Sequence, residues 1–146
     1  MFDIVHKLFG TGAGEASAPH DARRAVSGLL VMAARSDGTY DSGEKAVIDK
    51  VLSSRYGLSP EDAAALRAEG EADEADSIDL YQFTRAVREA VPIENRFDLL
   101  VSLWRVVLAD EHRDPLEDAL MRQLGDRLGL SPMDLAQARL VVAKGS

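Results

Sequence analysis

Three carboxylates recur with the same spacing at two places in the chain. Acids occupy the first, fifth and eighth positions of Asp37–Glu44 and again, 73 residues later, of Asp110–Glu117. The repeated acids are Asp37, Asp41, Glu44, Asp110, Asp114 and Glu117. Carboxylate oxygens are the ligands that hard ions such as Ca²⁺ and Mg²⁺ prefer. These six residues are therefore candidate metal ligands for a divalent cation.

Four of the six acids also have a structural explanation. Asp41 and Glu44, like Asp114 and Glu117, have the spacing of a capping box. In that motif the first side chain accepts a backbone N–H and the second reaches back to the first residue. Acids at a helix start are also stabilised by the helix dipole, by about 0.3–1 kcal/mol each. Capping and cation binding remain alternatives for these four side chains.

The other two acids lie where a helix dipole disfavours them. Asp37 and Asp110 each stand at the expected end of a helix, which carries negative partial charge. Three carboxylates on one turn repel each other unless a cation or an arginine neutralises them, and Arg35 and Arg113 are the nearby arginines. The spacing is not that of an EF-hand, because the twelfth position counted from Asp37 is Ile48 instead of Glu.

The repetition extends beyond the acids. The segments Gly57–Asp62 and Gly129–Asp134 share the pattern GLSPxD. The sequence therefore contains an internal repeat of one helical unit. We expect the first repeat at about residues 22–70 and the second at about 80–143. Between them, residues 69–79 hold six acids and no base, and we interpret this stretch as a helix end followed by a solvated acidic connector. After a one-residue deletion in the second repeat, Arg67 aligns with Arg139.

Apolar residues recur with helical spacing throughout the repeats. Val26, Leu29, Leu30 and Ala33 predict a helix from His20 to Arg35, and similar stripes follow in the rest of the chain. Glycine and proline fall almost entirely at the boundaries of these segments, and no segment shows the alternation of a strand. The sequence predicts an all-α fold of about seven helices, with the two repeats packed as one domain over residues 20–146.

Residues 1–19 form a separate N-terminal arm. Its first part is amphipathic, with Phe2, Ile4 and Leu8 among the apolar residues, and a glycine-rich linker begins at Gly10. Two interpretations of the arm stay open. It docks on the helical body, or it is an interfacial helix for a membrane or a partner.

The composition limits the choice of partner. The chain has 146 residues, with 17 basic against 25 acidic residues and a net charge of −8. Nucleic acid and anionic membranes are disfavoured, since both require a positive face, and a protein with a basic surface is the expected partner. With no cysteine, thiolate chemistry and disulfides are excluded. No apolar run reaches the length of a membrane span, and the composition is compatible with the cytoplasm.

The repeated turns resemble those of the tellurite-resistance TerB-like family. The resemblance is carried by an apolar helix that runs into Asp37-Gly38 and Glu44 and then ends at Gly57-Leu-Ser, with a second copy from Trp104 to Ser131. It implies an all-α fold of about seven helices with internal two-fold pseudosymmetry, in a cytoplasmic bacterial protein linked to tellurite resistance or general stress. It also implies acidic surfaces that bind a metal or a partner. The second turn departs from the family pattern, because Glu111 replaces the glycine.

No catalytic signature is present. The chain lacks the phosphate-loop, dinucleotide, zinc-protease and serine-hydrolase motifs, and its three histidines share no spacing. This absence favours a non-enzymatic protein, and together with the family resemblance it leads us to expect a stress-response module whose acidic turns bind a divalent cation. The alternative is a metal-independent adaptor that uses the same acidic surface to bind proteins. A carboxylate enzyme is the third hypothesis, and it would require a deep pocket that holds two of these acids.

Overall fold

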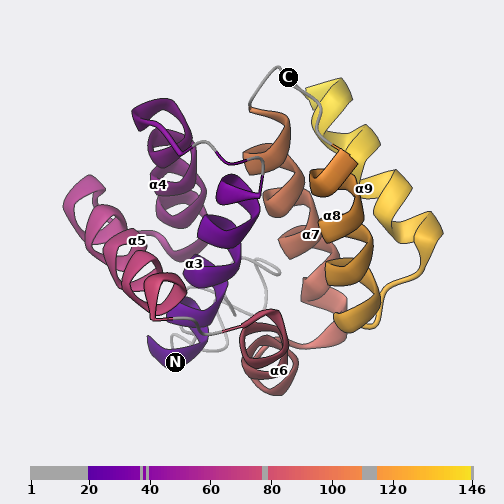
Figure 1. Cartoon of the computed structure of the whole chain (residues 1–146), viewed down its shortest axis with the longest axis horizontal. Coiled ribbons are helices and arrows are strands. Elements are labelled where there is room, and N and C mark those ends of the chain that lie inside the picture. The colour runs from indigo at the N-terminus through magenta and orange to yellow at the C-terminus, as the bar shows by residue number, and fades with distance from the viewer. Residues whose placement is uncertain (1–19, 37, 39, 77–78, 110–114, 146) are drawn as a thin grey trace, which may run out of the picture.

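The computed structural model describes residues 20–145, except residues 37, 39, 77–78 and 110–114. This described part contains seven helices and no strand (Figure 1). The helices are α3 (His20–Arg35), α4 (Ser42–Tyr56), α5 (Pro60–Ala75), α6 (Leu80–Ala90), α7 (Ile93–Leu108), α8 (Pro115–Arg127) and α9 (Pro132–Gly145). The predicted all-α fold is confirmed. The N-terminal arm, residues 1–19, lies outside the described residues.

The helices form two units of three. In Figure 1, α3, α4 and α5 occupy the left of the molecule, α7, α8 and α9 occupy the right, and α6 lies between them at the bottom. The first and third helices pack together in each unit, α3 on α5 and α7 on α9, and the two units meet through α3 and α7. The order and packing of the helices therefore follow the repeat in the sequence, with α6 as the connecting helix.

The repeated GLSP segments make the same helix junction in both units. Gly57 has a φ of 65° and Gly129 a φ of 78°, the left-handed conformation that glycine adopts with least strain. Two residues later Ser59 and Ser131 cap the next helix, and each Oγ accepts a backbone N–H, from Asp62 or from Asp134, at 3.1 Å. The repeated motif thus specifies a tight turn between the second and third helix of each unit.

Helix α3 is the centre of the core. It packs against α4, α5, α6, α7 and α8, and Leu29 and Leu30 are both fully buried. Every residue from Ala25 to Val31 is buried, so the middle of the helix is enclosed by its neighbours, while its charged residues lie nearer its ends. The apolar cluster continues from α3 into the second unit through Leu99, Leu103 and Trp104. One core therefore spans both units.

Helices α3 and α5 approach each other closely. A Cβ placed on Gly70 would lie 2.5 Å from Ser27 Oγ and 2.8 Å from the backbone N of Gly28, so no side chain fits there. Ser27 donates its hydroxyl hydrogen to the Leu66 carbonyl at 2.8 Å, which satisfies a polar group that is completely buried. This crossing holds α5, and the acids on it, against α3.

The helix ends near α6 are held by one arginine. The Arg96 guanidinium donates to three backbone carbonyls, those of Val91 at 3.0 Å, Arg88 at 3.0 Å and Leu128 at 3.1 Å. The last carbonyls of a helix have no partner within the helix, and a cation near them is favourable. Arg96 therefore ties the end of α6 to the end of α8.

Candidate functional site

The first acidic turn contains the predicted capping box. Asp41 precedes α4, and its Oδ1 accepts the Glu44 backbone N–H at 3.0 Å. Glu44 Oε1 accepts the Asp41 N–H at 3.3 Å in return. The Asp41 residue is exposed, whereas Glu44 is only 5% exposed. The structure thus brings two of the predicted ligands together at the start of α4 and gives both a structural role.

The second acidic turn repeats the burial of the glutamate. Glu117 lies in the first turn of α8, at the position that corresponds to Glu44, and is 3% exposed. Glutamate is almost never buried to this extent unless it is paired. The other three predicted ligands, Asp37, Asp110 and Asp114, lie outside the described residues. Within the described ranges, no three His, Cys, Asp or Glu side chains are grouped as a metal site.

The residue before Asp41 joins the turn to α5. The Tyr40 hydroxyl donates to Glu71 Oε2 at 2.5 Å. Its ring also lies against two cations, with the Arg35 guanidinium carbon 4.8 Å and the Lys45 Nζ 5.2 Å from the ring centroid. The start of α4 is therefore attached to α5 by a tyrosine, and positive charge already lies beside the acidic turn.

Arg67 completes this network from the middle of α5. Its Nε donates to Asp49 Oδ1 at 2.6 Å and its Nη1 donates to Glu71 Oε2 at 2.9 Å. Burial by itself would raise the pKa of Glu71, but the hydrogen bonds from Tyr40 and Arg67 outweigh it, and the pKa is lowered. Burial, followed by the hydrogen bond to Glu71, raises the pKa of Tyr40. The network therefore favours an ionised Glu71 and a neutral Tyr40.

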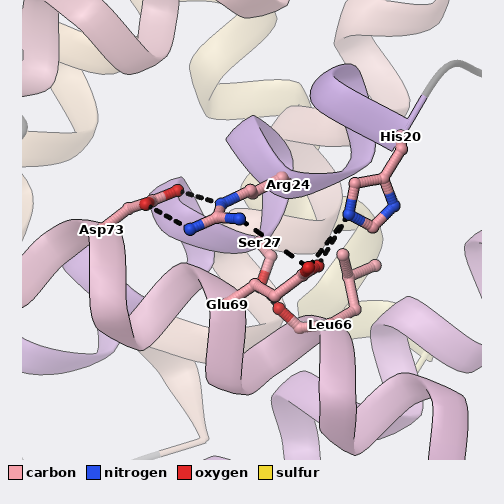
Figure 2. Close-up of polar contacts among 6 residues, drawn as sticks. All are labelled: His20, Arg24, Ser27, Leu66, Glu69 and Asp73. Carbon is pink, nitrogen blue, oxygen red and sulfur yellow. Dashed lines mark hydrogen bonds and ion pairs between the residues drawn. The ribbon is translucent and has the colours of Figure 1, made fainter.

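The acidic stretch of residues 69–79 begins within a helix. Helix α5 continues to Ala75, so the first four acids of the stretch are helical. Arg24 on α3 donates through Nε and Nη2 to the two oxygens of Asp73, at 2.6 Å and 2.7 Å. His20 Nε2 lies 3.0 Å from Glu69 Oε2 on the same face (Figure 2). These acids belong to the helix-end part of the stretch, and α3 supplies basic partners for them along the α3–α5 contact.

Arg35 is likewise engaged with α5. Its Nε lies 3.5 Å from Glu74 Oε1, in addition to its contact with the Tyr40 ring. From the sequence, Arg35 was expected to be a counter-ion for the acidic turn. The structure shows Arg35 in an ion pair with Glu74 of α5.

The sequence pattern did not predict the network of Tyr40, Asp49, Arg67 and Glu71. A partial signal was present, because Arg67 and Glu71 are four residues apart on one helix and such pairs face each other. Asp49 and Tyr40 come from other elements, and only the packing of α4 on α5 brings them to the arginine.

Two comparisons found no match: neither the curated proteins nor the solved structures contain a significant relative of this chain. A family model does match. Residues 23–140 fit the model described as tellurite resistance protein TerB, and this range includes all of α4 to α8 and most of α3 and α9. In the part of the chain that the structure describes, no helix is both long and apolar enough to cross a membrane.

Proposed function

The chain belongs to the TerB family of tellurite resistance proteins, and from that membership we propose that it is a cytoplasmic, non-enzymatic stress-response module whose acidic turns bind a divalent cation. The turns concerned join α3 to α4 and α7 to α8. The proposed ligands are the repeated acids, with Asp37 and Asp110 added to the residues at the helix starts. A protein with a net charge of −8 and no cysteine is poorly suited to bind the tellurite anion itself.

The observation that carries this proposal is the burial of two equivalent glutamates. Glu44 and Glu117 are 5% and 3% exposed, although each stands at the edge of an interhelix turn. Both carboxylates have interactions within the chain, and that of Glu44 accepts the Asp41 N–H in the capping box. The repeat places an equivalent carboxylate at the start of α4 and of α8, each three residues after another repeated acid in the sequence. Carboxylate oxygens grouped in this way are ligands that hard cations prefer.

The proposal is tested by titrating Ca²⁺, Mg²⁺ and Mn²⁺ into the full chain while the backbone amide of Gly38 is followed by NMR. Binding predicts saturable shifts that are lost in a double variant, Asp37→Asn with Asp110→Asn. Glu61→Gln is the matched control, since Glu61 is an exposed acid in the first turn of α5 and lies outside both acidic turns. Shifts no larger than those from added NaCl at equal ionic strength would refute cation binding.

A metal-independent adaptor is the second candidate, and α9 supports it. Met133, Leu140 and Val141 are 69%, 53% and 43% exposed on this one helix. Large apolar side chains gathered on one surface element suit a protein partner better than water. In this alternative the acidic turns select a partner with a basic surface. A complex that forms in the presence of chelator, and that Asp37→Asn weakens, would favour the adaptor over the cation site.

A further inference from the structure

A groove of about 780 Å³ runs between α4 and α7, where the two units meet, and the end of α9 forms its third wall. Its apolar lining consists of Val47 and Val51 on α4, Val101 and Leu108 on α7, and Val142 on α9. The lining along α7 covers residues 95 to 109, a length of about 20 Å in a helix. An apolar groove of this length suits an amphipathic helix of about three turns.

The polar part of this lining is more basic than acidic. Lys50, Arg55 and Arg105 line the groove, against one acid among the described residues, Asp98. The chain as a whole has a net charge of −8. The basic protein surface that we expect as a partner of the acidic turns therefore does not match the charge of this groove. An apolar segment that carries an acid on its polar side matches it better.

Residues 2–9 of the chain have the pattern that such a groove requires. On a helix, the apolar side chains of this segment share one side and the polar ones share the other. The apolar residues are Phe2, Ile4, Val5, Leu8 and Phe9. The polar residues are Asp3, His6 and Lys7. Amphipathic helices of this kind bind apolar grooves through anchors spaced i, i+3, i+4 and i+7.

The helix that continues the arm starts beside one end of the groove. The Arg23 guanidinium carbon, in the first turn of α3, lies 5.2 Å from the centroid of the Tyr56 ring at the end of α4. The neighbour of Tyr56 in the sequence is Arg55, whose Nη2 donates to the Asn95 carbonyl at 3.5 Å. Arg55 and Asn95 both line the groove. The connection between the arm and the helical body therefore lies close to the groove.

The linker of residues 10–19 sets the reach of the arm. A segment of ten residues spans at most about 35 Å when it is fully extended, which exceeds the length of the groove. Short glycine-rich linkers give the groups that they join an effective concentration of about 1 mM. A free partner of the same intrinsic affinity would need that concentration to compete. The connection therefore favours a segment of the same chain as the occupant of the groove.

We propose that residues 2–9 dock in this groove as an amphipathic helix of the same chain. The apolar side chains of the arm cover the valines of α4 and α7, and Asp3 faces the basic side chains that line the groove. A partner that uses this surface would have to displace the arm. The inference does not rest on cation binding by the acidic turns. Of the repeated acids that the structure describes, Asp41, Glu44 and Glu117, none lines the groove.

The experiment attaches a nitroxide spin label to the full chain and follows the amide signals of the arm by NMR. The chain has no cysteine, so Ser54→Cys provides a single attachment point at an exposed residue of the groove. Docking predicts that the signals of residues 2–9 broaden more than those of residues 10–19, although the linker is nearer to the helical body along the chain. Broadening that instead falls steadily from residue 19 to residue 2 overturns the proposal. Chelator is present throughout, so the outcome is independent of cation binding.

Variants of the arm identify the side that makes the contact. In the labelled chain, Phe2→Ser with Phe9→Ser removes two apolar anchors and should abolish the stronger broadening of residues 2–9. His6→Ser is the matched control on the polar side and should retain it. These substitutions lie outside the described helices, so the test does not depend on a change in the helical body. Broadening that is unaltered by loss of both phenylalanines overturns the proposal.

A pair of variants on α4 tests the groove. Val47→Lys puts a charge on the apolar wall and should abolish the stronger broadening. Ala46→Lys is the matched control, since Ala46 is an exposed neighbour that does not line the groove. A label at Gln123→Cys, an exposed position on α8 away from the groove, should not broaden residues 2–9 more than the linker. Equal broadening from the labels at Ser54→Cys and Gln123→Cys overturns the location.

A mixed sample shows whether the arm and the groove belong to the same chain. Spin-labelled chains without isotope are mixed with isotope-labelled chains without a spin label. Arm signals that stay sharp in the mixture support docking within one chain. Broadening as strong as in the single sample means that the arm of a second copy occupies the groove, and it overturns docking within one chain.

Discussion

The Arg24 guanidinium and the Asp73 carboxylate meet in two parallel hydrogen bonds, Nε to Oδ2 at 2.6 Å and Nη2 to Oδ1 at 2.7 Å (Figure 2). The hydrogen bond to Asp73 is the main cause that raises the pKa of Arg24. The two residues are 49 positions apart in the sequence and join α3 to α5. Paired hydrogen bonds of this kind fix the relative orientation of their two groups. The contact therefore positions the acidic end of α5 against the central helix.

We expect Asp73→Asn to lower the free energy of unfolding by about 1 kcal/mol, a value reduced for solvent screening because the Arg24 side chain is 38% exposed. Urea denaturation followed by circular dichroism measures it. The control is Glu89→Gln, which breaks the i,i+4 pair between Arg85 and Glu89, whose side chains are 62% and 67% exposed. That control should change stability by less than about 0.5 kcal/mol. Equal losses of unfolding free energy in the two variants would show that the ion pair between Arg24 and Asp73 stabilises the fold no more than an exposed surface pair does.

The close crossing of α3 and α5 gives a second prediction. Alanine at position 70 would place a Cβ 2.5 Å from Ser27 Oγ and 2.8 Å from the backbone of Gly28. The helices must then separate, and we expect Gly70→Ala to destabilise the fold by about 1–3 kcal/mol despite the better helix propensity of alanine. The change in thermal midpoint measures it.

Gly125→Ala is the matched control for that substitution. Gly125 is also a helical glycine, but a Cβ there meets only Leu135, at 3.8 Å. We expect this variant to be neutral or more stable by up to about 1 kcal/mol. A destabilisation as large as that of Gly70→Ala would contradict the assignment of the effect to the helix crossing.

Protonation of Glu71 is expected to make the stability of the fold depend on pH in the acid range. Its pKa lies below the ordinary value of 4.5, because the hydrogen bonds from Tyr40 and Arg67 outweigh the opposing effect of burial. A carboxyl group whose pKa is lower in the folded chain than in the unfolded chain stabilises the fold above the unfolded value. That contribution is lost as the pH falls through the folded value. The wild type should therefore lose stability as the pH falls below 4.5.

Glu71→Gln should lose less stability than the wild type across the same acid range, since it has no carboxyl group to protonate. Tyr40→Phe should also lose less, because one of the hydrogen bonds that lower the pKa of Glu71 is removed. Unfolding free energies at a series of pH values from neutral to acid provide the measurement. Parallel curves for the three proteins would mean that Glu71 does not link stability to pH.

Local features of the fold were predictable from the sequence, because they depend on neighbouring residues. The helix from His20 to Arg35 follows from its apolar spacing, and its bounds are those observed. The helix junction at Gly57 follows from glycine at the turn and Ser59 as the cap. The capping box of Asp41 and Glu44 follows from the three-residue spacing alone.

Contacts between distant segments were not predictable in the same way. The ion pairs of the acids on α5 were not predicted, because their partners, such as Arg24, lie on another helix. The network of Tyr40 and Arg67 depends on how α4 packs against α5, and no local pattern encodes that geometry.

Asp41 separates the capping role from the proposed cation site. Asp41→Asn keeps a side-chain oxygen that accepts the Glu44 N–H, and asparagine caps a helix about as well as aspartate. We expect this variant to retain most of its stability while its affinity for Ca²⁺ or Mg²⁺ falls, because one ligand charge is lost.

Asp41→Ala removes both functions, and it should lower the free energy of unfolding by about 1 kcal/mol. The matched substitution is Ser131→Ala, which removes the cap of α9 far from the acidic turns and should cost a similar amount. Only the Asp41 variants should change the response of stability to added cation, because a ligand that binds the folded chain raises its unfolding free energy. Thermal unfolding is measured without Mg²⁺ and at Mg²⁺ concentrations that rise in 10-fold steps, and it shows how stability depends on the ion. If wild type and Asp41→Asn respond identically to the ion, Asp41 acts as a helix cap and not as a metal ligand.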